Sequence, residues 1–173
     1  MRVAVLNQTH SAMLLRKGSR PQDKAIFEYR TTAMKTVYVT RRERFNAAHK
    51  LWNPKWDEAT NLKTFGKCAN PNWHGHNYDL FVTVKGQPQE DTGYCIDLKF
   101  MSDIIEEHVL SKMDHRNLNL DVPFLEGKMT SCEIVVIAIW EQLEPYLSNE
   151  EHQLHSIKLY ETENNIVEYF GGK

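Results

Sequence analysis

The stretch CANPNWHGHNYDL, residues 68–80, joins a thiol, a pair of imidazoles and the start of an alternating segment. Cys68 is followed six and eight residues later by His74 and His76, with one glycine between the histidines. Residues 76–87, HNYDLFVTVKGQ, alternate in the manner of a β-strand, with His74, Gly75 and His76 at its start. Side chains at positions i and i+2 of a strand share a face, so the two imidazoles should lie side by side.

A third histidine closes the preceding predicted strand. Residues 35–49, KTVYVTRRERFNAAH, are rich in β-branched and aromatic side chains and end at His49. If the two strands pair antiparallel, the end of one lies beside the start of the other. His49, His74 and His76 would then present three neutral imidazoles with an open fourth position, which is typical of a catalytic Zn²⁺ site. A structural zinc site would be closed by a fourth ligand.

The role of Cys68 stays open at this level. It could be a fourth metal ligand, a buried core thiol, or a nucleophile or base. Asp114 and His115 are adjacent and could form a proton relay or simply hydrogen-bond within a loop. Glu161 stands at a predicted strand end, where a solvated carboxylate is the ordinary expectation.

The remaining sequence predicts two helices and two further strands. Asp97 can cap a helix over 98–112, with Leu98, Met101, Ile105 and Val109 on one face. Thr130 and Glu133 fit a capping box that opens a second helix to about residue 146. The other predicted segments are a long loop at 50–73, a turn at 88–93 with a short extended piece at 94–96, a loop at 114–128, and strands at 155–162 and 165–170. The order ββααββ predicts an α+β fold, an antiparallel sheet with two helices on one face.

The composition bounds the class of protein. The chain of 173 residues has a net charge of −2 and a pI near 6.4, so no basic field favours nucleic acid or an anionic membrane. No apolar run approaches the ~20 residues that span a bilayer. Three widely spaced cysteines argue against a disulfide framework and favour a reducing, cytoplasmic location.

The N-terminal region differs from the rest of the chain. The first 33 residues hold six Lys or Arg against two acidic residues and show no sustained periodicity. They could be an Arg-bearing targeting segment, a disordered tail, or translation upstream of a start at Met34. We expect residues 1–34 to be a poorly ordered N-terminal extension and residues 35–173 to form one domain.

Several ordered motifs resemble one family. They are FNAAHKL at 45–51, FGKCANPNWHGHNY at 65–78, DTGYCIDL at 91–98, MDHRNLNLDVPF at 113–124, CEIVVIAIWEQL at 132–143 and YETENNIV at 160–167. Together they are similar to the 6-pyruvoyl-tetrahydropterin synthase and 6-carboxytetrahydropterin synthase family, over about residues 35–170. The order and spacing of the motifs make this resemblance far more specific than the HGH motif alone.

The resemblance implies a fold and an assembly. Members adopt the tunnelling fold, in which ββααββ subunits join their sheets into barrels, and are typically homohexamers built as dimers of trimers with interfacial active sites. The implied substrate is 7,8-dihydroneopterin triphosphate, a small pterin molecule. A sheet too small to close a barrel by itself would then be completed by neighbouring subunits.

The resemblance also assigns site residues. The family's zinc ligands fall on His49, His74 and His76. Its catalytic cysteine falls on Cys68, its Asp–His pair on Asp114 and His115, and its pterin-anchoring glutamate on Glu161. Glu133 matches a second carboxylate near the pterin, although its capping role would explain it equally well. Cys132 departs from the hydroxyl or small residue expected at its position.

The family resemblance leaves two possible reaction products. The implied reaction is a zinc-dependent lyase reaction that forms 6-pyruvoyl-tetrahydropterin with loss of triphosphate. The alternative is the 6-carboxytetrahydropterin synthase of the queuosine pathway, which uses the same substrate. The five-residue gap ANPNW between Cys68 and His74 resembles the pyruvoyl-forming type. A third branch with glutamate in place of the cysteine is disfavoured by Cys68.

Two hypotheses from other classes compete with this one. A non-catalytic, zinc-stabilised binding module would need only the three histidines and a fourth protein ligand, for which Cys68 is the candidate. A zinc hydrolase would need a general-base glutamate near the histidines, and the sequence supplies none there.

Overall fold

One twisted sheet forms the centre of the described part of the chain. The computed structural model describes residues 35–172, so the predicted extension at 1–34 lies outside the described residues. Neighbouring long strands pair antiparallel, namely β1 (Val37–His49), β2 (His74–Gly86), β4 (His152–Tyr160) and β5 (Ile166–Tyr169). A two-residue strand, β3 (Arg116–Asn117), runs parallel to β1 at the outer edge, which gives the order β3-β1-β2-β4-β5.

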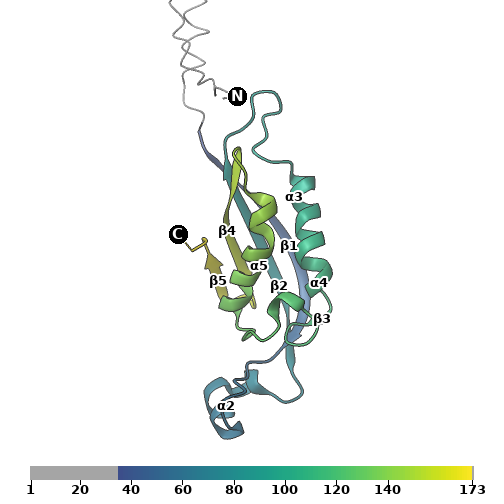
Figure 1. The fold of residues 1–173 in the computed structure, drawn as a ribbon, viewed down its shortest axis with the longest axis vertical. Helices are drawn as coiled ribbons and strands as arrows, with labels where there is room; N and C mark the ends of the chain where they lie inside the picture. Colours follow the sequence, from purple (N-terminus) through teal and green to yellow (C-terminus); the bar gives the residue numbers. More distant parts are fainter. Residues whose placement is uncertain (1–34, 173) are drawn as a thin grey trace, which may run out of the picture. The chain divides into compact units, whose positions relative to one another are not determined.

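Helices cover one face of this sheet (Figure 1). The first is continuous from α3 (Leu98–Ile105) through the π-helical segment η2 (Glu106–Leu110) to α4 (Ser111–Met113). The second is α5 (Cys132–Leu147). The predicted α+β class, the order of the long elements and the two helices on one face are confirmed. Among residues 35–172, no helix is long and apolar enough to cross a membrane.

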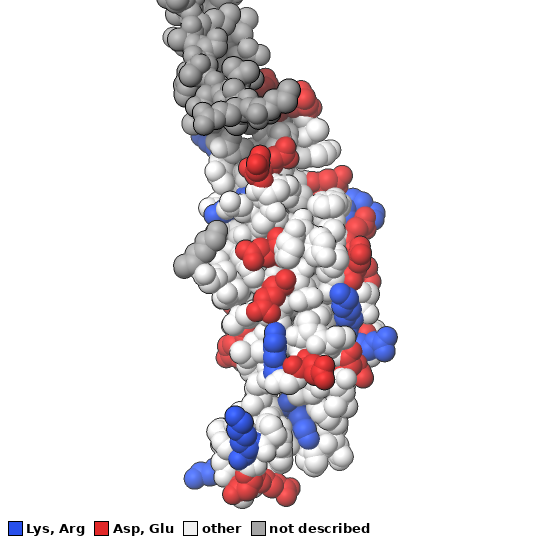
Figure 2. Space-filling model, in the orientation of Figure 1, with Lys and Arg blue, Asp and Glu red and all other residues white. Residues whose placement is uncertain are grey.

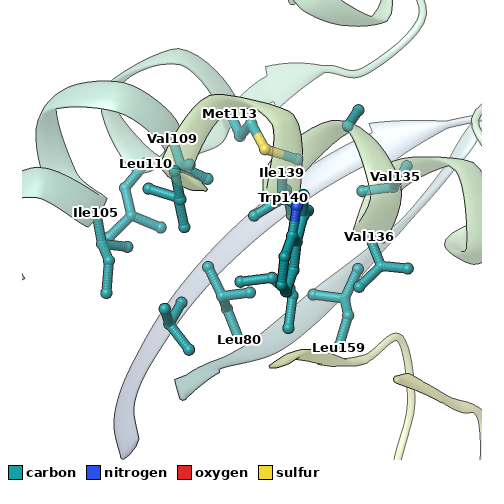
Figure 3. Packing of buried hydrophobic residues seen from close by; sticks show 14 of the residues in the cluster. Leu80, Ile105, Val109, Leu110, Met113, Val135, Val136, Ile139, Trp140 and Leu159 are labelled. Atoms are coloured by element: carbon teal, nitrogen blue, oxygen red, sulfur yellow. The ribbon is translucent and has the colours of Figure 1, made fainter. Parts of the chain in front are cut away.

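Side chains along each strand alternate between a buried face of the sheet, which carries the core, and an exposed face. On β1, Phe45, Ala47 and His49 are buried, whereas Arg42 and Arg44 are exposed on the opposite side. The buried side chains meet those of the helices in one cluster (Figure 3). Its labelled members include Leu80, Ile105, Val109, Ile139, Trp140 and Leu159. Each fully buried aliphatic side chain stabilises the fold by roughly 1.5–3 kcal/mol, which is what holds helices and sheet together.

The first predicted helix start is confirmed. Asp97 is the N-cap, and its carboxylate accepts hydrogen bonds from the backbone N–H of Lys99 over 2.6 Å and of Phe100 over 3.4 Å. Met101 and Val109 of the predicted apolar face are fully buried. Leu98, the first residue of α3, is 47% exposed and is not part of the core cluster.

The predicted capping box at the second helix is wrong. The helix begins at Cys132 with Ser131 at the N-cap, and no side chain caps it. Thr130 is fully buried, and its hydroxyl lies 3.1 Å from both the Lys50 carbonyl oxygen and Asn119 Oδ1. These tertiary partners take the hydroxyl that a capping box would use. Glu133 is therefore the second helical residue and closes no box.

The predicted loop at 50–73 is also wrong in part. It contains helix α2 (Glu58–Phe65) and the 3₁₀ turn η1 (Gly66–Ala69), which lie beyond the paired ends of β1 and β2 (Figure 1). Asp57 caps α2 by accepting a hydrogen bond from the Thr60 N–H over 2.7 Å. The flanking prolines and asparagines hid this short helix from the sequence pattern.

Three smaller differences complete the comparison with the sequence. The extended piece predicted at 94–96 is not a strand, although Cys95 and Ile96 are buried. The loop predicted at 114–128 contains β3 and the 3₁₀ turn η3 (Pro123–Leu125). Strand β4 begins at His152, three residues before the predicted start. Figure 2 shows acidic and basic side chains interspersed over one face, in keeping with the small net charge.

Candidate metal centre and active site

The three predicted metal ligands meet at the paired ends of β1 and β2. The strand register sets His49 directly opposite His74, and His76 lies two residues further along the same face. Each of the three rings offers one nitrogen as a ligand atom, and these three nitrogens all lie within 4.8 Å of one another. The ring centroids are 4.5 Å apart for His49 and His74, and 5.0 Å apart for His74 and His76. The hypothesis that antiparallel pairing gathers these imidazoles is confirmed.

Gly75 permits this close arrangement. A Cβ atom at Gly75 would lie 2.8 Å from the carbonyl oxygen of Ala47 on the facing strand, which is closer than real Cβ atoms approach. Any larger residue would push the strands apart between the two histidines. The glycine therefore fixes the separation of β1 and β2 at the point where the imidazoles converge.

Hydrogen bonding and burial prepare the imidazoles for a metal. His49 is 2% exposed, and its Nδ1 donates a hydrogen bond to the Thr130 carbonyl over 2.9 Å, which leaves the Nε2 lone pair free. Burial, the largest cause, lowers the pKa of His49 and of His74 below the ordinary value of 6.5. His74 Nδ1 is buried and has no hydrogen-bond partner among the described residues. Three neutral nitrogen donors fit a zinc ion well.

Glu161 lies beside these histidines. Its Oε1 is 3.6 Å from His49 Nε2 and 3.9 Å from His76 Nε2. Its other carboxylate oxygen lies 3.3 Å from Asn165 Nδ2, and its N–H donates to the Asn165 carbonyl over 3.0 Å. The side chain is only 18% exposed, so Glu161 is held against the imidazoles and is not the solvated strand-end carboxylate that the sequence alone suggested.

A cavity of about 950 Å³ opens next to the histidines. Its walls include His76, Asp114, His115 and Glu161, together with Asn77 and Tyr160. Four of the predicted site residues, from β2, the loop after α4 and the end of β4, therefore share one hollow. Such a hollow can hold a small organic molecule with one end against the histidines.

Asp114 and His115 form an oriented pair. Asp114 Oδ2 lies 2.9 Å from His115 Nδ1, while Asp114 Oδ1 accepts a hydrogen bond from the Asn46 N–H over 2.8 Å. The backbone hydrogen bond from Asn46 is the largest cause that lowers the pKa of Asp114; burial opposes it, and the contacts with His115 lower the pKa further. His115 has a left-handed backbone, with φ of 56°, and its N–H donates to the Asn46 carbonyl over 2.7 Å. The pairing occupies Nδ1 of the ring, and Nε2 lies 3.4 Å from Asn46 Nδ2.

Cys68 and Glu133 lie apart from this cavity. Cys68 is half-buried in η1, where its carbonyl accepts a hydrogen bond from the Leu51 N–H over 2.8 Å. Neither side chain lines the cavity, and Cys68 does not join the group of three metal-ligand donors found among residues 35–172. The structure thus gathers six of the eight predicted site residues around one centre and leaves Cys68 and Glu133 outside that cavity.

Tyr78 is a neighbour that the sequence reasoning missed. Its hydroxyl lies 3.5 Å from His49 Nε2, and its side chain is almost fully buried. Burial is the largest cause that raises the Tyr78 pKa, and the charges of Glu161, Cys132 and Cys68 add to it. The signal was available, because alternation in HGHNY puts Tyr78 on the same face as both histidines.

Fold and site together define a class of α+β protein that carries, at the end of an antiparallel sheet, a cluster of three histidines that could hold a metal ion. A family model described as 6-pyruvoyl tetrahydropterin synthase matches residues 38–172. The chain belongs to this family, and its fold is the tunnelling fold that the sequence resemblance implied.

Named relatives agree with the family match. The chain is 44% identical to the 6-pyruvoyl tetrahydrobiopterin synthase of Dictyostelium discoideum over 137 residues, which is 79% of this chain and 98% of the relative. It is 42% identical to the enzyme of that name from Pongo abelii over 133 residues, 77% of this chain and 90% of the relative.

A solved structure and a weaker relative complete the comparison. The structure of Caenorhabditis elegans 6-pyruvoyl tetrahydropterin synthase superposes with a TM-score of 0.75 at 37% identity, covering 80% of this chain and 98% of that one. A 6-carboxy-5,6,7,8-tetrahydropterin synthase of Bacillus subtilis is 23% identical over 98 residues, which is 55% of this chain and 63% of the relative. Similarity is therefore much stronger on the pyruvoyl side.

Proposed function

We propose that this protein is a zinc-dependent lyase that converts 7,8-dihydroneopterin triphosphate to 6-pyruvoyl-tetrahydropterin with loss of triphosphate. The observation that carries the proposal is the convergence of three metal-ligand donors within 4.8 Å, with Glu161 Oε1 3.6 Å from His49 Nε2, in a chain of this family. A metal centre beside a fixed carboxylate suits a substrate with a hydrogen-bonding ring and a hydroxylated side chain.

Glu161 would hold the pterin ring. A pterin presents an amino group and a ring N–H side by side, and a carboxylate can accept both hydrogen bonds at once. Asn165 Nδ2 lies 3.3 Å from Glu161 Oε2 and helps to hold the carboxylate in place. Glu133, at the start of α5, is a second carboxylate that we propose near the bound ring, and it has no capping duty that would occupy it.

The histidines would place the substrate side chain at the metal. Bound zinc supplies Lewis acidity to the side-chain oxygens, which makes the neighbouring C–H groups easier to deprotonate. Cys68 is the proposed base for those protons. His115 would carry protons on and off the substrate through Nε2, while Asp114 holds the ring by its Nδ1 over 2.9 Å and balances its charge.

The complete site would form between subunits. We propose a homohexamer, a dimer of trimers in which neighbouring sheets close a barrel. Two features support this: among residues 35–172 the sheet has helices on one side only, and Cys68 does not line the cavity that holds Asp114 and His115 within one chain. A neighbouring copy can bring a thiol and this cavity together. The free thiols of Cys68, Cys95 and Cys132 suit a reducing cytoplasm.

Product analysis tests the proposed function. Zinc-loaded protein is mixed with 7,8-dihydroneopterin triphosphate without reductant, and the products are identified by mass spectrometry. Triphosphate and a 6-pyruvoyl pterin support the proposal. A 6-carboxy pterin with acetaldehyde would assign the chain to the alternative reaction, which the similarity to known proteins does not favour. Unchanged substrate from folded, metal-loaded protein would reject both.

The Cys68→Ala variant separates catalysis from a non-catalytic, zinc-stabilised binding module. We expect zinc content to stay at the wild-type level while turnover is lost, because Cys68 lies outside the group of metal-ligand donors. If Cys68 were a closing zinc ligand, zinc affinity and stability would fall together.

A further inference from the structure

A lysine ammonium group is held between two indole rings next to the histidine centre. Lys50 directly follows His49, and Trp73 directly precedes His74. Lys50 Nζ lies 4.7 Å from the ring centroid of Trp73 and 5.0 Å from that of Trp52. Attraction between a cation and two aromatic faces fixes the position of the ammonium group.

Hydrogen bonds also hold the backbone of Lys50 in place. The Lys50 N–H donates to Asn119 Oδ1 over 3.0 Å, and the Lys50 carbonyl accepts from Asn119 Nδ2 over 3.1 Å. The Thr130 hydroxyl lies 3.1 Å from the same carbonyl, and the Thr130 backbone carbonyl is the group that orients His49. Thr130, which is buried, therefore contacts both Lys50 and the metal-ligand candidate His49.

Trp73 contacts Lys50 from a strained backbone conformation. Its φ is 66°, a left-handed conformation that is uncommon for a bulky residue. A hydrogen bond from its N–H to the Asn70 carbonyl, over 3.0 Å, helps hold that turn. The left-handed turn reverses the chain just before His74, and the Trp73 ring then lies over the ammonium group of Lys50.

Among the described residues, no carboxylate forms an ion pair with Lys50. Among residues 35–172, the ion pairs that lysine and arginine side chains form belong to other residues: Arg41, Arg42, Arg44, Lys99, Lys128 and Lys158. An aromatic ring offers a cation no hydrogen-bond acceptor in its plane, so the three N–H donors of Lys50 remain available. The side chain is half-buried and reachable from solvent.

The charges around the site differ between its two ends. Asp114, Glu161 and Glu163 line the cavity beside His76, while Asp79 there is paired with both Arg42 over 2.8 Å and Arg44 over 2.7 Å. A polyanion is repelled from these carboxylates. Lys50 stands beyond the last paired residues of β1 and β2, where the chain offers a positive charge. A ligand with a neutral ring and an anionic tail is thereby oriented with the ring toward Glu161.

We propose that Lys50, clamped by Trp52 and Trp73, binds the triphosphate group of the substrate. This inference rests on the proposed function and names the group that recognises the anionic end of that substrate. The clamp reduces the entropy that a free lysine loses when it binds phosphate oxygens, so a single lysine contributes more than a mobile surface lysine would.

A binding experiment on zinc-loaded Cys68→Ala protein tests the proposal without turnover. The dissociation constants of 7,8-dihydroneopterin triphosphate and of 7,8-dihydroneopterin are measured by calorimetry, with Lys50 intact and with Lys50→Met. Loss of one charge-assisted contact should weaken the triphosphate ligand about 10- to 100-fold and leave the phosphate-free ligand unchanged. Zinc content is measured in each sample, because a purely structural clamp would alter it.

Lys85→Met is the matched control, because Lys85 lies near the opposite end of β2. It should change neither constant, and Lys50→Arg should restore most of the affinity for the triphosphate ligand. Equal weakening of both ligands by Lys50→Met, or no change in either, would overturn the inference. Wild-type turnover, measured in parallel, shows whether the proposed function survives such a result.

Trp73→Gly tests the clamp itself. Glycine relieves the left-handed backbone at φ of 66° and removes one of the two rings that hold Lys50. We expect the triphosphate ligand to bind more weakly while the midpoint of thermal unfolding does not fall. Unchanged triphosphate affinity in Trp73→Gly would show that the ring has no part in anion binding.

Discussion

Nδ1 of His49 donates a hydrogen bond over 2.9 Å to the backbone carbonyl of Thr130, 81 positions further along the chain. A strand residue thus has its ring orientation and tautomer set by the segment that leads into α5. Because a backbone carbonyl can only accept, Nε2 must carry the lone pair, and it faces His76 and Glu161. The metal centre therefore depends on the packing of α5 against the sheet as well as on the strand register.

Replacing His74 by alanine should abolish stoichiometric metal binding. His74 supplies one of three donors, and its buried Nδ1 has no other partner among the described residues, so two imidazoles alone would hold zinc weakly. Zinc per chain after dialysis, measured by inductively coupled plasma mass spectrometry, checks this. His155→Ala, on β4, is the control and should keep its zinc. Full occupancy in His74→Ala would refute the three-histidine assignment.

Gly75→Ala should weaken both fold and metal site. The new methyl group would meet the Ala47 carbonyl oxygen at 2.8 Å, so the strands must separate between the two histidines. Overpacking of this kind typically costs about 1–3 kcal/mol. Urea denaturation and zinc affinity should both decline, whereas Gly172→Ala, whose methyl group would meet only the Tyr169 hydroxyl at 3.3 Å, should change neither. Wild-type zinc affinity in Gly75→Ala would show that strand separation is not critical.

The sequence predicts the histidine centre well because its determinants are local. Two histidines at i and i+2, and a third at the end of a preceding strand, need only antiparallel pairing to meet. Nothing local predicts that Glu161 would lie 3.6 Å from His49, because that contact depends on β4 pairing with β2 and was suggested only by family resemblance. Tertiary contacts likewise decide the role of Thr130, whose hydroxyl contacts Lys50 and Asn119 and does not cap α5.

The missed helix α2 shows a different limit of the sequence. Its residues have almost no apolar stripe, so the usual periodicity is absent. What stabilises the segment is Asn61, which is fully buried and hydrogen-bonds to the backbone of Asn53, Trp56 and Asp57. A single polar side chain that organises a loop gives no periodic pattern to detect.

Asn61→Ala should therefore destabilise residues 50–73 strongly. The Asn53 N–H would lose its 2.7 Å contact with Asn61 Oδ1, and three carbonyls would lose a donor. Unsatisfied buried groups cost about 1–3 kcal/mol each, so we expect a loss of about 2 kcal/mol or more. Hydrogen exchange of α2 amides should accelerate before global unfolding changes. Asn61→Asp keeps the acceptor for the Asn53 N–H but sets a buried carboxylate against three carbonyl oxygens, so it should destabilise the segment at least as much as Asn61→Ala. Unaltered exchange in Asn61→Ala would contradict this account.

Cys132→Ala should improve resistance to alkali. Burial, with Glu161 and Glu133 adding, raises the pKa of the Cys132 thiol to about 12. The neutral thiol is thus favoured by folding: its contribution is complete below the ordinary pKa of 9.0 and is lost as the pH rises toward 12. The free energy of unfolding should fall less between pH 8 and 10.5 in Cys132→Ala than in wild type. Parallel curves would show that the thiol does not control alkaline stability.

Acid should destabilise the protein through His152, a residue remote from the metal ligands in the strand register. His152 is 8% exposed at the start of β4, and neither ring nitrogen has a hydrogen-bond partner among the described residues. Burial lowers the pKa of His152 below 6.5, and the neighbouring Glu151 carboxylate opposes this only in part. The unfolded chain therefore takes up a proton more readily than the folded one, so the free energy of unfolding falls as the pH drops below 6.5.

Because burial also lowers the pKa of His49 and of His74, the test of His152 is a difference between variants. The free energy of unfolding is measured by urea denaturation at pH 7.5 and pH 5.5 for wild type, His152→Leu and the control His155→Leu. Leucine cannot be protonated, so His152→Leu should lose less stability between the two pH values than wild type does. His155→Leu should follow wild type, because His155 is half-exposed. An equal loss in wild type and His152→Leu would mean that His152 has no part in acid sensitivity.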